Sequence, residues 1–418
     1  MKVGIIGGGV AGLVSAWLLE QEHEVVLFEQ QHRLGGHAHT IYVDQNGESV
    51  PIEIGFEFFN ERMFPYFCSL LNLLNIPTEP YPFTYTFFNN AGNPFILPPI
   101  QRHNIFWHDF KPTNISYLAQ LAYLLQKGKN VIQEQNIQLT IESFLQSLRL
   151  TDSFKNNLFL PLFSAGWGIT PDELRSLSAY NVLSWLIDNK PMGLQDSIWL
   201  EIPTGMSSYV EALAAQLTKS TIKTSTVIRD ITYNNGHYNI HEQHGTAIEV
   251  DHLIIATNAI QANKLLQGIA HAQAVKEVLT TIEYIHATIA VHNDLRFMPT
   301  NKQDWSVANV WYNGHASTLT IHKPWKSDSP LLRSWLLPSF DKPANIIAQE
   351  HFYHAKPTPA YFKAQELIAT QQGKNNVWLA GIYTNGIDAH ESALLSGVQI
   401  ATKLAPYGQR LQTLLRNL

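Results

Sequence analysis

The sequence is poor in cysteine, in charged residues and in long apolar runs. Among its 418 residues only Cys68 is a cysteine, which excludes a disulfide framework within the chain, a thiolate zinc cluster and a CxxC redox pair. Charged residues make up 15% of the chain and hydrophobic residues 45%, so the composition is not that of a disordered protein. Acidic residues outnumber Lys and Arg by 34 to 28, and we therefore expect no nucleic-acid partner.

The sequence also lacks targeting signals and the common hydrolytic and metal motifs. No run of about 20 apolar residues predicts a membrane-spanning helix, and the N-terminus does not resemble a secretory signal. Together with the single cysteine, this favours a cytoplasmic location. There is no HExxH, no P-loop and no nucleophile elbow, so we expect no metal site. Aromatic residues, in contrast, are abundant, with 10 Trp, 16 Tyr and 20 Phe, and such residues fill cores or line apolar pockets.

The first 29 residues have the pattern of a dinucleotide-binding unit. Residues 2–6 are mostly apolar and β-branched, which predicts a buried strand. Gly7, Gly9 and Gly12 follow in the G-x-G-x-x-G spacing, and then come a predicted helix over 13–21 and a second predicted strand over 24–28. Glycines in this arrangement allow a tight turn, a close approach of backbone to a pyrophosphate, and close packing of helix on strand. A purely structural glycine turn is the alternative.

An acidic residue and an arginine complete the pattern. Glu29 lies 17 residues after Gly12, where an acid accepts hydrogen bonds from a ribose hydroxyl. Arg33, Gly35 and Gly36 then form an R-x-G-G turn. This turn resembles the one beside the pyrophosphate and ribityl chain in FAD enzymes of the amine oxidase and phytoene desaturase superfamily. A β-turn with a solvated arginine is the alternative.

Further segments resemble the same superfamily, in the same order along nearly the whole chain. They are residues 35–40, 54–62, 159–167, 203–206, 291–299 and 378–397. Most closely they resemble a bacterial branch described as predicted NAD/FAD-binding or flavin-containing amine oxidoreductases. The resemblance implies an α/β fold, with a Rossmann-type FAD-binding domain of glutathione reductase-like, p-hydroxybenzoate hydroxylase-like topology. This domain would be interleaved with an α+β substrate domain.

The resemblance also implies that the chain passes several times between the two domains. We assign residues 1–60, 196–260 and 346–405 to the FAD-binding domain, and residues 61–195 and 261–345 to the substrate domain. Residues 221–231 and 238–241 alternate like strands, and residues 260–345 are expected to form further strands and loops. Residues 406–418 predict a docking helix, with a peripheral membrane or partner contact as the alternative.

The expected cofactor is FAD, held without a thioether because Cys68 lies outside the C-terminal flavin segment. The contacts that the resemblance implies are Gly7, Gly9, Val10, Ala11, Gly12, Glu29, Gln30, Arg33, Gly35, Gly36, His37, Gly55, Phe56, Val227, Ala256, Thr257, Asn258, Gly381, Ile382, His390, Glu391 and Ala393.

The C-terminal flavin segment supplies the candidates for chemistry. An apolar strand over 377–380 is followed by a predicted helix over 391–404, and in the superfamily the N-terminus of this helix faces the N1–C2=O edge of the flavin. A positive helix end there stabilises the negative charge of the reduced flavin. His390 is the candidate group at this end, with ordinary helix capping as the alternative for His390 and Glu391.

Two positions depart from the superfamily pattern. Ile382 stands where many relatives have an acid that holds the ribityl chain, and Ala389 stands where monoamine-type oxidases have an aromatic wall. Tyr383 or Trp311 could replace that wall, and His315 and His292 are candidate acid–base groups. The candidate pocket walls are Phe56, Phe59, Trp167, Trp199, Trp311 and Tyr383.

We therefore expect an FAD-dependent oxidoreductase that removes hydride from a small apolar or amphiphilic substrate, such as an acyl chain or polyene. The first alternative is a flavin amine oxidase. The second is a flavin-binding partner subunit without turnover, and the third is a protein that binds only NAD. The sequence predicts neither the electron acceptor nor the oligomeric state.

Overall fold

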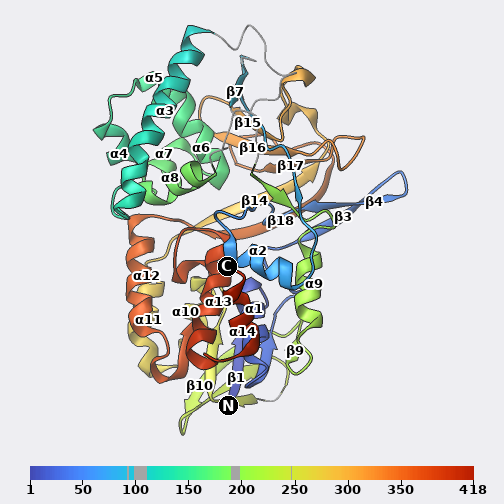
Figure 1. Cartoon of the computed structure of the whole chain (residues 1–418), viewed down its shortest axis with the longest axis vertical. Helices are drawn as coiled ribbons and strands as arrows, with labels where there is room; N and C mark the ends of the chain where they lie inside the picture. Colours follow the sequence, from blue (N-terminus) through green and yellow to red (C-terminus); the bar gives the residue numbers. More distant parts are fainter. Residues whose placement is uncertain (92–93, 98–110, 190–197, 246) are drawn as a thin grey trace.

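The chain forms two halves and passes between them several times (Figure 1). In this computed structural model, residues 1–91, 94–97, 111–189, 198–245 and 247–418 are described. The lower half contains the N-terminus and a parallel sheet, and the upper half contains a seven-stranded sheet and a group of helices. Parts of the predicted substrate domain, 98–110 and 190–195, lie outside the described residues.

A parallel five-stranded sheet forms the centre of the lower half. Its order is β19-β13-β1-β2-β9. The strands are β1 (Lys2–Ile6), β2 (Glu24–Phe28), β9 (Thr221–Lys223), β13 (His252–Ile255) and β19 (Val377–Leu379). From β1 the chain adds β2 and β9 on one side of the sheet and later adds β13 and β19 on the other side. The end of β1 therefore lies at the point where ligands bind in doubly wound sheets. The predicted Rossmann-type α/β class is confirmed.

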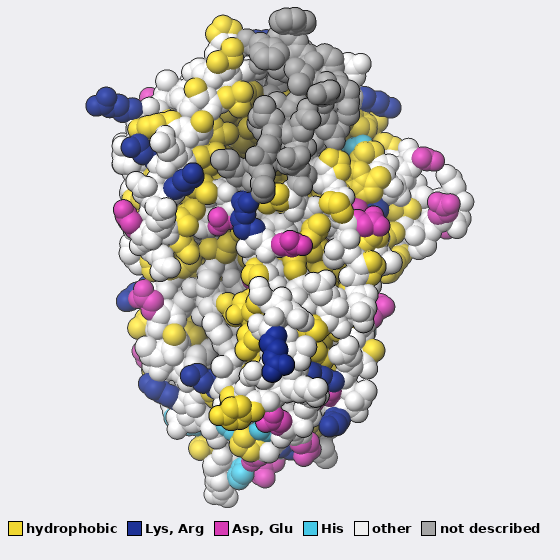
Figure 2. All heavy atoms as spheres, viewed as in Figure 1, with side chains coloured by type: hydrophobic (Ala, Val, Ile, Leu, Met, Phe, Trp, Pro, Cys, Tyr) yellow, Lys and Arg dark blue, Asp and Glu magenta, His cyan; other side chains and the backbone are white. Residues whose placement is uncertain are grey.

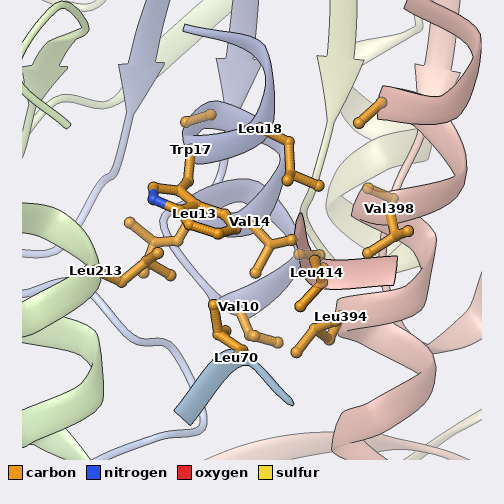
Figure 3. Close-up of a cluster of buried hydrophobic side chains, with 14 of the residues drawn as sticks. Val10, Leu13, Val14, Trp17, Leu18, Leu70, Leu213, Leu394, Val398 and Leu414 are labelled. Carbon is orange, nitrogen blue, oxygen red and sulfur yellow. The ribbon is translucent and has the colours of Figure 1, made fainter. Parts of the chain in front are cut away.

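One face of this sheet is covered by an almost wholly apolar core. All ten residues of α1 (Val10–Leu19) are buried, and they pack against α2 (Pro65–Leu73), α9 (Ser207–Ala215), α13 (His390–Leu404) and α14 (Gln409–Arg416). Figure 3 shows side chains of α1 between Leu213 of α9 and Val398 of α13, with Leu414 of α14 at the same centre. The C-terminal helix therefore closes the core that the first helix begins.

The other face carries a small antiparallel sheet and three helices. The strands are β10 (Ile228–Asn234), β11 (His237–Glu242) and β12 (Ala247–Val250), and the helices are α10 (Ala259–Leu265), α11 (Gln273–Leu279) and α12 (Pro359–Gln371). Together they bury a second core. Two expectations were wrong here. Residues 221–231 are two strands in different sheets, separated at Ser225, whose φ is +52°. Residues 260–345 contain the helices α10 and α11 besides strands and loops.

The upper half is built on a mostly antiparallel sheet with the order β18-β14-β17-β16-β15-β6-β7. Its strands are β6 (Tyr85–Asn89), β7 (Phe95–Leu97), β14 (Tyr284–His292), β15 (Ala308–Tyr312), β16 (Ser317–His322), β17 (Leu332–Trp335) and β18 (Ile346–Ala355). Helices α3 (Pro112–Gln133), α4 (Ile141–Ser147), α5 (Asp152–Phe154), α6 (Leu160–Trp167), α7 (Pro171–Arg175) and α8 (Ala179–Asp188) pack beside it around a third core. Two strand pairs, β3 (Thr40–Gln45) with β4 (Glu48–Glu53) and β5 (Glu79–Pro80) with β8 (Leu200–Glu201), complete the strands.

The predicted domain limits stay a prediction. Two elements are relevant to them: β18, which falls in the range assigned to the FAD-binding domain, and α11, which falls in the range assigned to the substrate domain. Strand β18 begins at residue 346 and pairs along its length with β14 in the upper sheet. Helix α11 packs in the second core of the lower half.

On the face shown in Figure 2, apolar side chains are frequent in the upper half, and Lys and Arg are scattered without forming one patch. Within the part of the chain that the structure describes, no helix combines the length and the apolar character needed to cross a bilayer.

Candidate functional site

The glycine loop after β1 leaves an opening at one position. A Cβ on Gly7 would lie 2.5 Å from the Ala256 carbonyl oxygen, and a Cβ on Gly12 would lie 1.9 Å from the Gly7 carbonyl oxygen. A Cβ on Gly9, in contrast, would meet nothing within 4 Å. Gly7 and Gly12 are therefore required by the protein's own packing, whereas Gly9 keeps a space free in front of the N-terminus of α1.

The R-x-G-G turn lies directly against this loop. The Gly35 N–H donates to the Gly8 carbonyl at 2.8 Å, and a Cβ on Gly36 would lie 3.2 Å from the Gly9 Cα. The Arg33 guanidinium donates to the Gly36 carbonyl at 3.0 Å, and its partial burial lowers the pKa of Arg33. A cation and two backbone turns thus meet at the opening beside Gly9, as an anionic pyrophosphate would require.

Glu29 holds the same loop from the end of β2. One carboxylate oxygen accepts the Gly8 N–H at 2.7 Å and the other accepts the Gln31 N–H at 2.8 Å. Gln30, which lies between Glu29 and Gln31, is exposed. The carboxylate therefore lies against the glycine loop, where the sequence predicts a ribose contact.

A second group of predicted contacts follows the R-x-G-G turn. The His37 carbonyl accepts the Phe56 N–H at 2.8 Å, and a Cβ on Gly55 would lie 2.0 Å from the same carbonyl oxygen. The Phe56 ring is stacked on the imidazole of His390, with centroids 4.1 Å apart and planes 8° apart. The structure thereby brings the segment around residue 37, the segment around residue 55 and the start of α13 together.

His390 opens α13 as a neutral imidazole. Its Nε2 lies 2.9 Å from the Tyr209 hydroxyl, and burial lowers the pKa of His390 to about 3. Burial also lowers the pKa of His354 to about 3. The imidazoles of His390 and His354 are therefore neutral at pH 7. The ring of His37 lies 5.2 Å from that of His354, and His37 is exposed.

Glu391 caps a helix, but not the one to which it belongs. Its two carboxylate oxygens accept the N–H groups of Tyr66 at 2.7 Å and Phe67 at 3.0 Å, at the start of α2. Burial raises the pKa of Glu391 to about 7. Helix α13 itself receives no side-chain cap from Ala389, although the Ala389 carbonyl accepts the Ser392 N–H at 3.0 Å. The N–H groups of His390 and Glu391 therefore stay available.

The remaining predicted contacts lie at the ends of β13 and β19. Asn258 caps α10 by accepting the Gln261 N–H at 2.9 Å, and Thr257 and Ala256 precede it with partly accessible side chains. Gly381 has φ +140° and donates its N–H to Ser396 Oγ at 2.8 Å. The Ile382 carbonyl accepts the Tyr361 hydroxyl at 2.6 Å.

Four further predicted contacts complete the set: Val227, which is 44% exposed ahead of β10, Val10 and Ala11, which are buried in α1, and Ala393, which is partly buried in α13.

Three other candidates for the chemistry occupy different elements, and Tyr383 lies in the 3-10 turn Ile382–Thr384, which packs against α13. Tyr383 is 1% exposed in the second core of the lower half. Trp311 lies on β15, where its ring contacts Phe88, Phe297 and Phe340. His315 is exposed in the turn between β15 and β16.

The other predicted walls and His292 occupy mixed positions. Phe59 is fully buried in the first core, and Trp199 packs among the aromatic rings of Phe58 and Phe83. His292 is bonded to Ser334 Oγ at 2.8 Å within the upper sheet. Trp167 is partly accessible and reaches the loop before α13. The roles of all these residues stay predictions.

Sequence reasoning missed two buried polar groups beside the site. Asp388, two residues before His390, accepts hydrogen bonds from three side chains of the upper helices. Glu57 next to Phe56 pairs with Lys323 at 2.8 Å and Arg333 at 2.7 Å, and Arg333 also donates to the Gly55 carbonyl at 3.0 Å. A carboxylate directly after an apolar pair is the one local signal for Glu57. Asp388 has no local signal, because its partners lie more than 200 residues away.

The described residues fit FAD. The free space at Gly9, the half-buried Arg33 and the N-terminus of α1 suit a pyrophosphate, Glu29 suits a ribose, and the uncapped start of α13 suits the electron-rich edge of a reduced flavin.

Comparisons with known proteins agree with this fit. A family model described as flavin containing amine oxidoreductase matches residues 10–298, more than half of the chain. No curated protein matches the sequence.

Solved structures share the fold at low identity. Cyclohexylamine oxidase from Brevibacterium oxydans IH-35A has a TM-score of 0.68 at 16% identity, over 97% of this chain and 98% of that chain. A CLA-producing fatty acid isomerase from P. acnes has a TM-score of 0.69 at 15% identity, over 96% and 98%. A putative protoporphyrinogen oxidase from Exiguobacterium sp. 255-15 has a TM-score of 0.64 at 16% identity, over 96% and 98%. With the family match and a site built for FAD, the chain belongs to the flavin-containing amine oxidoreductase family and is an FAD-dependent oxidoreductase.

Proposed function

We propose that this oxidoreductase removes hydride from an apolar or amphiphilic substrate, such as an acyl chain or a polyene, with FAD bound non-covalently. The observation that carries the proposal is the neutral, stacked imidazole at the start of α13. Burial lowers the pKa of His390 to about 3, and its ring is stacked on the ring of Phe56. This pair of rings favours an apolar reacting group over a charged one.

FAD, when bound, supplies the acceptor for the hydride. The residues of the chain hold the reacting surfaces in place and exclude water. Phe56 and the Tyr209 hydroxyl fix the ring of His390 from two sides, and Arg333 fixes the carbonyl of Gly55. Because each of these groups is itself packed or bonded, the reacting surfaces are held before the substrate arrives, which lowers the entropic cost of alignment.

Non-covalent binding is supported by the state of Cys68. The thiol lies in α2, and burial raises its pKa to about 12. A thiol with such a pKa is not ionised at pH 7 and is a poor nucleophile toward a flavin.

A flavin amine oxidase is the second candidate function. The solved cyclohexylamine oxidase and putrescine oxidase structures share the fold. Against it stand the 3% exposed Ala389, which offers no aromatic wall, and Trp311, whose ring packs on Phe297 and Phe340. A partner subunit without turnover is the third candidate, and Ile382 in place of an acid is its support.

The decisive experiment is anaerobic reduction of the FAD-loaded protein. An unsaturated fatty acid, a polyene, cyclohexylamine and putrescine are each added, and the visible band of the oxidised flavin is followed. Bleaching by the fatty acid or the polyene alone supports the proposal, and bleaching by an amine alone overturns it in favour of the amine oxidase. No bleaching by any compound, together with a photoreduced flavin that no acceptor reoxidises, would identify the partner subunit.

We also propose a cytoplasmic location. Leu411 and Leu414 of α14 are fully buried, which supports a docking helix over a peripheral membrane contact.

A further inference from the structure

One buried carboxylate joins the upper helices to the loop that leads into His390. Asp388 lies in the loop between residue 384 and α13. Its Oδ2 accepts the indole N–H of Trp167 at 2.5 Å, and its Oδ1 accepts the indole N–H of Trp185 at 2.9 Å and the amide of Asn181 at 2.6 Å. The Asp388 N–H donates in return to Asn181 Oδ1 at 3.1 Å. Helices α6 and α8 are therefore both tied to this single side chain.

We propose that Asp388 is a positioning residue of the flavin site, whose ionised carboxylate orients the Trp167 and Trp185 indoles and holds α6 and α8 over the start of α13. The inference rests on the proposed flavin site. It concerns the chain's own contacts, which exist with or without the cofactor.

The chemistry of the donors requires the ionised form. Both indoles and the amide of Asn181 present N–H groups to the carboxylate, and an ionised carboxylate is a pure acceptor. Protonation of Asp388 removes the negative charge that strengthens these three hydrogen bonds and leaves a hydroxyl oxygen that is a weaker acceptor, so the bonds weaken. The three donors come from helices, which move as rigid elements, and the weakening is therefore transmitted to α6 and α8.

The electrostatic surroundings make Asp388 sensitive to pH. No described Lys, Arg or His forms an ion pair with it. Burial raises the pKa of Asp388 to about 6, against the opposing effect of its hydrogen bonds. The facing titratable group is the Tyr361 hydroxyl of α12, whose pKa is raised by burial and by the Asp388 charge. Tyr361 is therefore neutral across the range in which Asp388 titrates.

The placement links this carboxylate to the reacting centre. Asp388 is two residues before His390, and Trp167 ends the segment 159–167 that resembles the superfamily. Ala389 does not supply an aromatic wall. Trp167 approaches this loop from α6, and Asp388 sets the orientation of its ring.

The test compares four forms of the full chain: the unchanged protein, Asp388→Asn, Trp185→Phe and Trp325→Phe. Trp325 is the matched control, because its indole also donates to a carboxylate, Glu201, at 2.7 Å, and its ring packs on Tyr81 in a different cluster. Hydrogen exchange of α6 and α8 is measured on the FAD-free protein. Reoxidation of the photoreduced flavin by oxygen is measured on the loaded protein across pH about 5 to 8, a range that brackets the titration.

We expect exchange in α6 and α8 of Asp388→Asn to be about tenfold faster, the effect of one lost hydrogen bond. The reoxidation rate of the unchanged protein should change with an apparent pKa near 6, and this step should be absent from Asp388→Asn. In Trp185→Phe the step should move to higher pH, because a bond that favours the ionised form is gone, and in Trp325→Phe it should not move.

Unchanged exchange in Asp388→Asn, or a step near pH 6 that persists there, overturns the inference; a step near pH 7 belongs to Glu391 and is expected in every form. If Asp388→Asn does not fold, an unshifted step in Trp185→Phe overturns it equally. If no form of the protein retains FAD, the proposed function fails, while the exchange measurement still decides the role of Asp388.

Discussion

Replacing Gly9 by alanine separates the protein's own packing from the space kept for a ligand. Gly9 has φ −74° and ψ −179°, an extended conformation that any residue adopts, and its added Cβ would meet nothing within 4 Å. Gly9→Ala should therefore leave the fold intact and stabilise it by about 0.4–1 kcal/mol through the unfolded state. At Gly12 the added Cβ would lie 1.9 Å from a backbone oxygen, so Gly12→Ala should destabilise the protein by about 3 kcal/mol or more.

The effect on FAD is expected to be the reverse of the effect on stability. A methyl group at Gly9 occupies the space through which the pyrophosphate approaches the N–H groups of α1. Losing two hydrogen bonds to a charged group costs about 1.5–3 kcal/mol each, which weakens FAD by about 10²- to 10⁴-fold.

The assay measures unfolding by urea and FAD affinity by calorimetric titration of the FAD-free protein, for both variants. Gly9→Val, with its larger side chain, should bind still less FAD while remaining folded. A Gly9→Ala or Gly9→Val protein that folds and retains full FAD affinity would refute the assignment of the pyrophosphate to this opening.

Three further predictions concern carboxylates. The pKa of Glu391 is raised to about 7, so Glu391 binds a proton more tightly in the folded state than in the unfolded state. Its contribution to the free energy of unfolding should therefore fall by about 3 kcal/mol as the pH rises from about 4.5 to 7. Urea unfolding of the FAD-free protein and of Glu391→Gln across this range gives the difference curve, and a flat curve contradicts the prediction. Glu57→Gln should lower the free energy of unfolding by about 3–5 kcal/mol, because Lys323 and Arg333 lose a buried partner; a change below about 1 kcal/mol, the size of a surface pair, would contradict it. Glu29→Gln should weaken FAD about tenfold or more through one lost charge-assisted bond, and unchanged calorimetric affinity would remove Glu29 from the site.

The nucleotide unit could be predicted from the sequence because its signals are local. The bounds of β1 and β2 are as predicted, and the roles of Gly7 and Gly12 in packing follow from spacing alone. The predicted helix over 13–21 begins earlier, at Val10, because the glycine turn already directs the chain into the helix.

The polar contacts around α13 could not be predicted, because each joins segments far apart in the chain. For Glu391 the sequence offered a flavin contact or, as the alternative, a cap on its own helix; its carboxylate instead caps α2, more than 300 residues earlier. Asp388 and Trp167 are separated by 221 residues. The chain has 18 histidines and 34 acidic residues, and neither residue type nor local pattern shows which of them meet at one place. The sequence therefore favours Tyr383, Trp311 and His315 as candidates for the chemistry as much as His390.

The strand order of the parallel sheet has a consequence for the synthesis of the protein. Strand β13 pairs with β1 on one side and with β19 on the other, and β19 begins 122 residues after β13 ends (377 minus 255). At about 5–20 residues per second, the ribosome makes this stretch in about 6 to 24 s. During this time one edge of β13, a wholly buried strand in the finished fold, has no partner within its own chain. We therefore expect nascent chains that stop between β13 and β19 to aggregate or to bind chaperones.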